Sequence, residues 1–224
     1  MAVMPVELLV LAKQPVPGRV KTRLCPPCTP DQAAAVAAAA LADTLDAVHA
    51  TDVAGRTLVL DGRYPAPSGW RTVPQHGTGL GERIAHAFAD TAVPGRASLL
   101  VGMDTPQLTP ELLGELMERL EAGADAVLAP ALDGGWWALA LRDPARASVL
   151  ASVPMSTSDT GTGTLEALRD NGCAVTIGPL LRDVDTAEDA RVVAALAPAG
   201  RFAAAVATAL PAAQPHRTGA RVGR

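Results

Sequence analysis

Three positive charges fall within five positions after the first apolar run of this sequence. The stretch LLVLAKQPVPGRVKTRL, residues 8–24, starts as a strand, breaks at prolines and a glycine, and then carries Arg19, Lys21 and Arg23. Cations spaced in this way can neutralise a polyphosphate through charge-assisted hydrogen bonds. The glycines of a P-loop or of a dinucleotide-binding fingerprint are missing, so neither motif explains the loop. We predict a phosphate-binding loop of another type; the alternative is a solvated basic surface loop.

Acidic residues stand at the ends of later apolar runs. Asp104 follows the run Ala97–Gly102, Asp133 opens an Asp-Gly-Gly turn, and Asp183 and Asp185 come after the last short run. Carboxylates in such places can hold Mg²⁺ or Mn²⁺, which take oxygen ligands and share their shell with substrate phosphates. Three of these aspartates also have a simpler explanation, because Asp104 and Asp133 suit turns and Asp185 suits the N-cap of a helix. One cationic loop facing several acidic ones favours a phosphate-rich substrate held with a divalent metal.

A glycine-rich stretch, QHGTGLGER at residues 75–83, precedes a helical pattern. Glycines let a ligand approach the backbone closely, and the Gln75 side chain could read the edge of a base. A flexible loop explains the same residues without a ligand. Adjacent Trp136 and Trp137 alternate sides on an expected strand, so one should face the core and the other should line a cleft.

Short aliphatic runs alternate with helical patterns, which indicates a mostly parallel sheet covered by helices on both faces. The turn at Asp133 adds an antiparallel strand. Ligands in such α/β folds bind beyond the carboxyl ends of the strands, where the charged loops would lie. The expected strands are Val6–Ala12, Arg56–Leu60, Trp70–Val73, Ala97–Gly102, Ala126–Ala131, Trp136–Leu141 and Cys173–Ile177, and the expected helices are Pro30–Ala50, Leu80–Asp90, Thr109–Gly123, Thr160–Asn171 and Thr186–Ala197.

The 224 residues are enough for one domain with a full core, which we place at residues 1–197. Hydrophobic residues make up 49% of the chain but aromatic residues only 3%, so alanine, leucine and valine must build that core. Residues 198–224 are rich in alanine, proline and arginine, and we expect a loosely attached helix followed by disorder.

Charge and hydropathy argue against several classes of protein. The net charge of −4 disfavours a general nucleic-acid binder, which would need a basic face. No apolar run approaches the roughly 20 residues of a membrane span, and the N-terminus shows no secretory signal pattern. Cys25 and Cys28 lack the second pair of a zinc site and the helix of a redox motif, and Cys173 makes the count odd. We expect a cytoplasmic, reduced protein without membrane or nucleic-acid partners.

Four segments together resemble a known family. LAKQPVPGRVKTRL, VGMDTPQLTPELL, APALDGGWWALAL and RDVDTAEDA occur in the order found in the DUF2064 family, and the similarity covers residues 6–196. That family belongs to the GT-A, or nucleotide-diphospho-sugar transferase, superfamily, and the chain also looks like a relative of the 2-phospholactate guanylyltransferases. The resemblance implies a GT-A-like, Rossmann-like three-layer α/β sandwich with a mostly parallel sheet.

The resemblance also implies roles for single residues. The phosphates of a nucleotide would contact the loop residues Lys13, Arg19, Lys21 and Arg23, and its base would contact Gln75, Gly77, Leu80 and Gly81. A metal ion, Mg²⁺ or Mn²⁺, would be held by Asp104 and Asp185, with Asp183 as a substitute ligand. The acceptor side would include Asp133, Gly134 and Gly135, and catalysis would depend on Lys21, Arg23 and Asp104. The chain departs from the family pattern at Met103, Thr105, Gln107 and Trp136, which concerns the acceptor more than the nucleotide.

These implied roles leave three functions open. The first is a nucleotidyltransferase that joins a nucleoside triphosphate to a small phosphorylated acceptor and releases pyrophosphate, through charge neutralisation and in-line positioning. The second is a glycosyltransferase that moves a sugar from a nucleotide-sugar to a small acceptor, and the third is an inactive nucleotide-binding regulator. The cations of the loop favour the first, because a triphosphate carries more charge. The base, the acceptor and the oligomeric state, a homodimer included, stay open.

Overall fold

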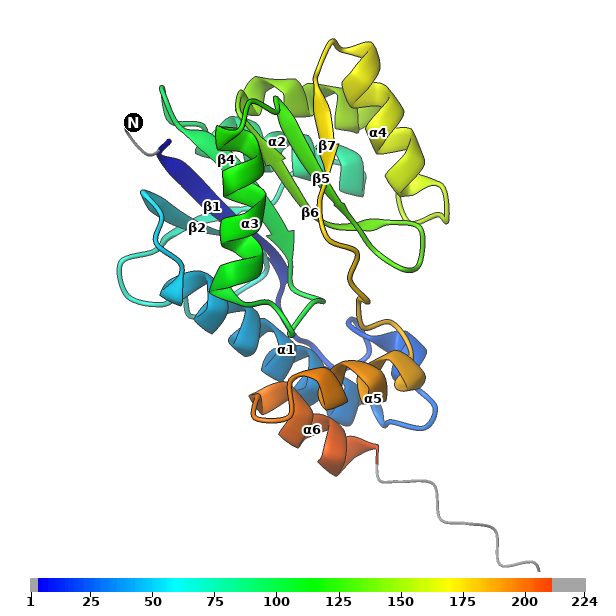
Figure 1. Ribbon diagram of the computed structural model, residues 1–224. Coiled ribbons are helices and arrows are strands. Elements are labelled where there is room, and N and C mark those ends of the chain that lie inside the picture. The colour runs from blue at the N-terminus through cyan, green and yellow to red at the C-terminus, as the bar shows by residue number, and fades with distance from the viewer. Residues whose placement is uncertain (1–3, 211–224) are drawn as a thin grey trace, which may run out of the picture.

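The computed structural model describes residues 4–210, and these form a seven-stranded mixed sheet with the strand order β3-β2-β1-β4-β6-β5-β7 (Figure 1). Neighbouring strands are parallel except that β6 is antiparallel to β4 and to β5. The expected α/β sheet with its antiparallel strand after Asp133 is therefore confirmed. The strands are β1 (Val6–Lys13), β2 (Gly55–Asp61), β3 (Arg71–Pro74), β4 (Ala97–Gly102), β5 (Ala126–Pro130), β6 (Trp136–Leu141) and β7 (Val175–Ile177).

Helices cover both faces of this sheet. One face packs against α1 (Pro30–Ala50) and α3 (Pro110–Glu121), and the other against α2 (Leu80–Thr91), the 3₁₀ helix η2 (Pro144–Ser152) and α4 (Thr160–Asp170). In Figure 1, α3 crosses in front of the sheet while α2 lies behind it. The three layers of the expected sandwich are thus present, and η2 is an element that the sequence pattern did not indicate.

The central strands are continuous aliphatic runs because both of their faces are buried. Leu8, Leu9 and Val10 of β1 have no exposed surface. Successive side chains point to opposite faces, so Leu8 and Val10 join the cluster under α1 and α3, and Leu9 joins the cluster under α2 and η2. A strand packed in this way gives a rigid base to the loop that follows it.

Helix α1 begins where its capping signal predicts. The Thr29 hydroxyl accepts a hydrogen bond from the amide of Gln32 at 3.2 Å, and the Gln32 side chain accepts one from the amide of Thr29 at 2.8 Å. By length and composition α1 could cross a membrane, so the expectation that no apolar run approaches that length is wrong. One such helix is weak evidence of a membrane protein, because buried core helices pass the same test, and 56% of its apolar window is buried inside the protein.

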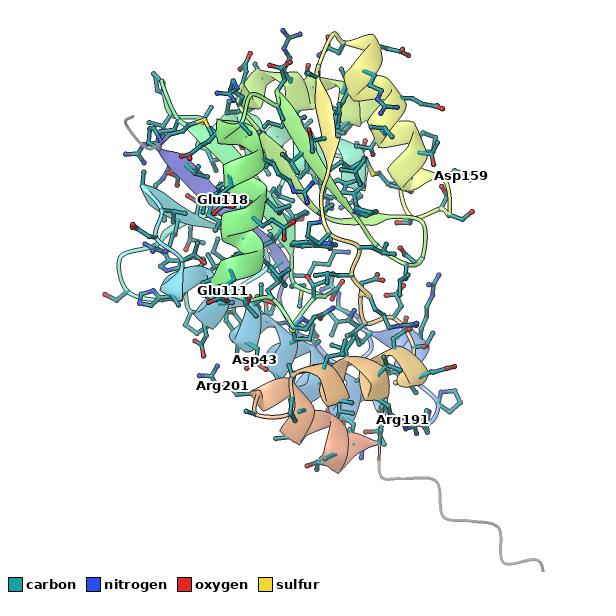
Figure 2. The ribbon with its side chains drawn as sticks, in the orientation of Figure 1. Asp43, Glu111, Glu118, Asp159, Arg191 and Arg201 are labelled. Carbon is teal, nitrogen blue, oxygen red and sulfur yellow. The ribbon has the colours of Figure 1, made fainter. Side chains whose placement is uncertain are left out.

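The packed part of the chain extends past residue 197, where we had placed the domain boundary. After α5 (Ala187–Leu196), helix α6 (Arg201–Ala209) buries Phe202 and Val206 in a cluster shared with α1 and α5. The carboxylate of Asp43 on α1 accepts hydrogen bonds from the amides of Arg201 at 3.1 Å and Phe202 at 2.8 Å, and Figure 2 shows Asp43 and Arg201 side by side. Helix α6 is therefore firmly attached, and the rest of the expected tail, residues 211–224, lies outside the described residues.

Candidate functional site

The charged loops meet in one cleft at the carboxyl ends of β1 and β4. Its volume of about 750 Å³ suits a ligand of nucleotide size. The cations come from the end of β1 and the loop after it, and the acids come from the loop after β4, the β5–β6 turn and the segment after β7. These charged lining residues are Lys13, Arg19, Lys21, Arg23, Asp104, Asp133, Asp183 and Asp185, so the formal charges of the lining cancel. Of the other expected site residues, Gln75, Leu80 and Gly135 line the cleft, whereas Gly77, Gly81 and Gly134 do not.

The ammonium group of Lys21 lies between two aspartate carboxylates. Its Nζ is 2.7 Å from Oδ1 of Asp104 and 3.8 Å from Oδ1 of Asp185, and it also donates a hydrogen bond to the carbonyl of Val184. Only 7% of the Lys21 side chain is exposed. The amide of Val184 donates to the carbonyl of Asp104 at 3.0 Å, which joins the same two loops through the backbone. Lys21 is therefore a structural link between the two acidic loops as well as a cation of the cleft.

The remaining cations of the cleft differ in their pairing. Nη1 of Arg23 is 3.0 Å from Oδ2 of Asp185, although 72% of the Arg23 side chain is exposed. The side chains of Lys13 and Arg19 form no ion pair with any described residue. Lys13 and Lys21 are also the two lysines of the whole chain, so both lysines line this cleft. Two of the four cations are thus available to a ligand at once, and the other two must first leave an aspartate.

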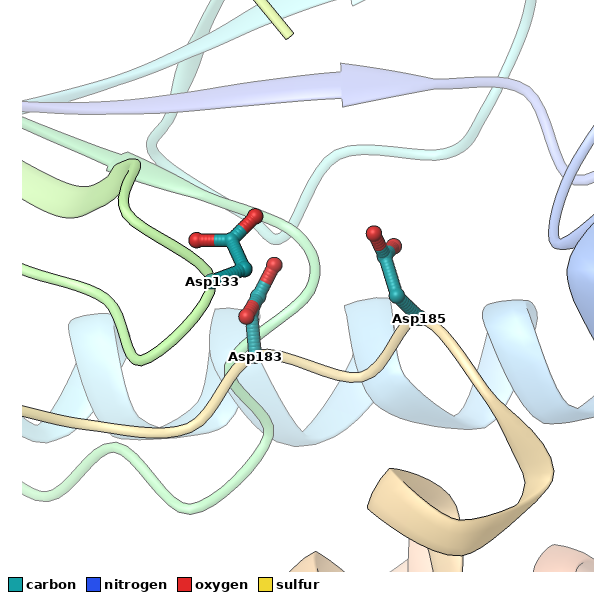
Figure 3. Close-up of side chains that lie close together, drawn as sticks. All are labelled: Asp133, Asp183 and Asp185. Carbon is teal, nitrogen blue, oxygen red and sulfur yellow. The ribbon is translucent and has the colours of Figure 1, made fainter. Parts of the chain in front are cut away.

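Three carboxylates form a compact oxygen-rich group beside Lys21. Asp133, Asp183 and Asp185 each present an oxygen, and these three oxygens all lie within 4.8 Å of one another (Figure 3). The geometry joins Asp183 and Asp185 to Asp133, whereas the sequence resemblance had paired Asp185 with Asp104. Asp104 lies outside this group, and its Oδ1 contacts Lys21 instead. We call Asp133, Asp183 and Asp185 the acidic triad.

The surroundings of Asp183 shift the pKa of its carboxyl group. Burial of its carboxyl group, together with the negative charges of Asp133 and Asp185, raises the pKa of Asp183 to about 6. In the unfolded chain this carboxyl group ionises near pH 4, so its ionisation between about pH 4 and pH 6 is less favourable in the folded state. The metal-free protein therefore loses stability from this group as the pH rises through that window, and a cation bound to the triad would reverse the loss.

This pKa predicts that metal binding strengthens with pH. We expect Mn²⁺ to raise the melting temperature clearly more at pH 7.5 than at pH 5.0, because the proton on Asp183 competes with the metal at the lower pH. The measurement is a thermal-shift titration with MnCl₂ at the two pH values, with Asp183→Asn as the control that should remove the pH dependence. An equal stabilisation at both pH values would contradict the prediction.

Asp185 can face the cleft because its neighbour caps α5. The Thr186 hydroxyl accepts a hydrogen bond from the amide of Asp189 at 3.2 Å, and the Asp189 carboxylate accepts one from the amide of Thr186 at 2.9 Å. The capping box is therefore one residue later than the one that would use Asp185 and Glu188. No cap role ties up the Asp185 carboxylate, so both of its oxygens contact the cations of the loop.

Gln75 has a structural role that limits its contact with a base. Its Nε2 donates to the carbonyls of Ala12 at 2.7 Å and Val59 at 3.0 Å, which fixes the side chain across the ends of β1 and β2. Its Oε1 is buried and has no hydrogen-bond partner among the described residues. The amide nitrogen is therefore fully used by the protein, and only the oxygen could accept a hydrogen bond from a ligand.

Packing against η2 requires a glycine at position 81. A Cβ atom at this position would lie 2.3 Å from the carbonyl oxygen of Leu150 in η2, so α2 and η2 touch through the bare backbone. A Cβ at Gly114, in the interior of α3, would meet no atom within 4 Å. Gly81 and Gly114 therefore allow the same substitution, glycine to alanine, to be compared at a crowded and at an open position of a helix.

We expect Gly81→Ala to destabilise the protein by about 1–3 kcal/mol, because the added methyl group forces two packed helices apart. Gly114→Ala should instead stabilise it by about 0.5–1 kcal/mol, because alanine loses less backbone entropy in a helix. Urea denaturation of both variants checks the opposite signs. A neutral Gly81→Ala with weaker nucleotide binding would favour the ligand contact that the resemblance implied.

The Asp133 turn is built around close backbone contacts. The Asp133 carboxylate accepts a hydrogen bond from the amide of Gly135 at 2.8 Å. Gly134 has a φ of +90°, and a Cβ there would lie 2.0 Å from the carbonyl oxygen of Ser158. The amide of Gly161 donates to the carbonyl of Gly134 at 2.8 Å. The turn that positions one acid of the triad is thus fixed against the segment that leads into α4.

The central part of the chain identifies its family. The model of the family described as "Uncharacterized protein conserved in bacteria (DUF2064)" matches residues 33–157, which is more than half of the chain. The chain belongs to the DUF2064 family. The segments VGMDTPQLTPELL and APALDGGWWALAL lie inside the matched span, whereas the cationic loop and RDVDTAEDA lie outside it. No curated protein matches this sequence.

Solved structures share the fold of this DUF2064 protein. A Desulfovibrio desulfuricans G20 protein, provisionally described as a nucleotide-diphospho-sugar transferase, is 24% identical with a TM-score of 0.77, over 91% of this chain and 97% of that one. Rv0371c of Mycobacterium tuberculosis H37Rv, also solved as a manganese complex, is 22% identical with a TM-score of 0.56, over 86% and 98%. CMP:2-keto-3-deoxy-manno-octonic acid synthetase, solved with CTP, is 12% identical with a TM-score of 0.55, over 87% and 99%. These likenesses show a GT-A and nucleotidyltransferase-like fold.

The cleft of the DUF2064 protein also has a wall in which the sequence indicated a tryptophan but not the other residues. This wall, which we call the Trp136 wall, consists of Trp136, Met155, Ser156, Thr157 and Ser158. The sequence signal that could have indicated these residues is the hydroxyl-rich run MSTSDT, residues 155–160, which leads into α4 at the same edge of the sheet as the Asp133 turn. Trp136 is half-buried and its Nε1 donates to Thr164 at 3.1 Å. Trp137 is 3% exposed and donates to the carbonyl of Pro179 at 2.9 Å, so Trp137 is the core residue of the pair.

Proposed function

We propose that this protein is a metal-dependent nucleotidyltransferase that transfers a nucleotidyl group from a nucleoside triphosphate to a small acceptor and releases pyrophosphate. The observation that carries the proposal is one cleft at the strand ends, in which four cations from the end of β1 and the loop after it face four aspartates. Phosphates need cations, and a divalent metal needs oxygen ligands, so one cleft offers both halves of a metal–nucleotide site. The shared fold of CMP:2-keto-3-deoxy-manno-octonic acid synthetase, which was solved with CTP, supports the same proposal.

The cations would act in two groups. Lys13 and Arg19 form no ion pair with a described residue, so they would bind the phosphates first. Lys21 and Arg23 would then turn from the aspartates to the phosphates, because a polyphosphate offers them more negative charge than one carboxylate each. In this view the loop holds the triphosphate in line with the acceptor, and positioning with charge neutralisation lowers the barrier.

The acidic triad fits a divalent metal. Its three carboxylate oxygens lie within 4.8 Å of one another, and hard cations such as Mg²⁺ and Mn²⁺ bind such oxygen donors. A bound ion would neutralise charge on the phosphates and on the leaving pyrophosphate. Rv0371c, which shares the fold, was solved as a manganese complex. Asp133, Asp183 and Asp185 would hold the ion, and Asp104 holds Lys21 beside them until a nucleotide binds.

The proposed transfer is a displacement at phosphorus. An oxygen of the acceptor forms a bond to the α-phosphorus, and the bond from that phosphorus to the bridging oxygen breaks. Pyrophosphate leaves with the electron pair of the broken bond, and a proton from an acceptor hydroxyl passes to water. The side chains of Lys13, Arg19, Lys21 and Arg23 stabilise the charge that gathers on the leaving group.

A second function is glycosyl transfer from a nucleotide-sugar, and one observation favours it. Lys21 and Arg23 are already paired with aspartates, which leaves the positive charges of Lys13 and Arg19 unpaired. Two charges match a diphosphate better than a triphosphate. The description of the Desulfovibrio desulfuricans protein as a nucleotide-diphospho-sugar transferase agrees with this alternative.

The released product distinguishes these functions. The full chain with Mn²⁺ is given each nucleoside triphosphate or each common nucleotide-sugar, together with a pool of small metabolites. We expect pyrophosphate in a coupled assay with at least one triphosphate. Consumption of a nucleotide-sugar without pyrophosphate from any triphosphate would establish glycosyl transfer instead. Nucleotide binding without either product would favour an inactive regulator.

A further inference from the structure

Positive charge is unevenly distributed in the cleft. All of its lining cations lie between residues 13 and 23, and the Trp136 wall contains no basic residue among those that the structure describes. The wall offers instead an indole ring, the side chain of Met155 and the hydroxyl groups of Ser156, Thr157 and Ser158. The hydroxyls of Ser156 and Ser158 have no hydrogen-bond partner among the described residues, and both residues are exposed. The wall can therefore contact hydroxyl groups and an apolar surface, but it cannot neutralise a phosphate.

Backbone geometry marks this wall as a functional surface. Two non-glycine residues of the described chain have positive φ angles, Lys21 at 48° and Ser156 at 62°. Both of them line the cleft, although they lie far apart in the sequence. A left-handed conformation is unfavourable for a non-glycine residue, and such residues cluster at ligand sites where the surrounding structure holds them. Ser156 in the Trp136 wall and Lys21 on the opposite side of the cleft thus share a backbone conformation that is typical of ligand sites.

The wall is also held rigidly. The indole of Trp136 is fixed by its hydrogen bond to Thr164 in α4. The carbonyl of Ser158 packs against Gly134 so closely that no side chain would fit, and Gly161 donates a hydrogen bond to the carbonyl of Gly134. A rigid wall loses little entropy on binding, which suits the selection of a ligand by shape.

We propose that the Trp136 wall binds a neutral carbohydrate, a sugar or cyclitol ring without a phosphate group, as the acceptor of the reaction. Its role as the acceptor rests on the proposed function, whereas its binding does not. The ring C–H face would pack on the indole of Trp136, and ring hydroxyls would exchange hydrogen bonds with Ser156 and Ser158. A phosphate on this wall would lie near the Asp133 turn without a cation, at a cost in desolvation and repulsion. The phosphorylated acceptor that the sequence suggested is thus less suited to this surface.

Saturation-transfer NMR on the full chain tests the proposal with two probes, methyl α-glucoside and glucose 6-phosphate. The variants are Trp136→Leu, which removes the ring, Arg19→Ala, which removes an unpaired cation, and Trp70→Leu as a matched control away from the cleft. We expect the glucoside signal to fall about fivefold in Trp136→Leu and to stay unchanged in Arg19→Ala and Trp70→Leu. Any signal from glucose 6-phosphate should fall in Arg19→Ala and stay unchanged in Trp136→Leu, because its phosphate would bind the cations between residues 13 and 23.

A gain-of-function variant keeps the test independent of folding defects. Ser158→Arg places a cation on the wall, so it should strengthen the binding of glucose 6-phosphate relative to the glucoside. The proposal is overturned if the glucoside gives no signal, if Trp136→Leu equals Trp70→Leu, or if glucose 6-phosphate depends on Trp136 in the unaltered chain. An equimolar mixture of nucleosides is a further probe. If its signal falls in Trp136→Leu, the proposal is also overturned, because the wall would then bind the nucleotide base. Failure of pyrophosphate release, in contrast, would reject the proposed function and leave these binding results intact.

Discussion

Asp185→Asn is expected to lower metal-dependent turnover by about two to three orders of magnitude. Asp185 contributes an oxygen to the acidic triad and contacts both Lys21 and Arg23, so one substitution removes a metal ligand and a partner of two cations. Stability should change by less than about 1 kcal/mol, because the loss of the pairs with Lys21 and Arg23 is offset by weaker repulsion from Asp133 and Asp183. The measurement is turnover at a series of Mn²⁺ concentrations together with the melting temperature.

Glu188→Gln is the matched control for this variant. Glu188 is exposed, lies three positions after Asp185 in the first turn of α5, and does not line the cleft. The control makes the same change in charge and should retain full turnover. If Asp185→Asn also retained its turnover at every metal concentration, the acidic triad would not be the metal site. A loss in both variants would show that net charge near α5, rather than Asp185 itself, controls the activity.

Lys21→Ala is the second substitution with a large expected effect. We expect turnover to fall about 100- to 1000-fold, because the phosphates lose the most buried cation of the cleft. In contrast to an ordinary surface lysine, it should also destabilise the metal-free protein by about 1–2 kcal/mol, because Asp104 and Asp185 lose the ammonium between them. Mn²⁺ should restore part of the lost stability by supplying another cation to the same acids.

Lys21→Arg tests whether charge alone is sufficient. A guanidinium group is planar and larger than an ammonium group. It cannot contact Asp104, Asp185 and the carbonyl of Val184 from one atom as Nζ does. We therefore expect Lys21→Arg to recover less than a tenth of the original turnover, with turnover and the Mn²⁺ response of the melting temperature measured side by side. Full activity in this variant would mean that any cation serves. An unchanged melting temperature in Lys21→Ala would contradict the structural link between the acidic loops.

Local signals in the sequence were sufficient to predict most of the fold. The aliphatic runs of β1 and β4 are buried on both faces. In an α/β protein, a short continuous apolar run is typical of a central strand of the sheet. The capping box at Thr29 located the start of α1 because its hydrogen bonds are made within one turn. The same kind of signal was ambiguous at α5, where Asp185 with Glu188 and Thr186 with Asp189 both fit a capping box, and the structure uses the second.

The parts of the site that were missed depend on contacts between distant segments. Nothing near Lys21 in the sequence shows that its ammonium lies between Asp104 and Asp185, since that contact joins three separate loops. The grouping of Asp133 with Asp183 depends likewise on how the β5–β6 turn meets the segment after β7. Gly81 resembled a ligand-binding glycine, but its environment is the carbonyl of Leu150 on another element. Sequence patterns identify the residue types of a site more readily than their partners.

The placement of the two lysines has a consequence for chemical modification of this protein. Lys13 is exposed at the end of β1, whereas Lys21 is shielded and bound by carboxylates, so an amine-reactive ester should acylate Lys13 in preference to Lys21. Reductive methylation, which normally alters lysines scattered over a protein surface, would here alter a cation of the cleft. A fluorophore on Lys13 would report directly on what enters the cleft, and a phosphate-bearing ligand should protect Lys13 from the reagent.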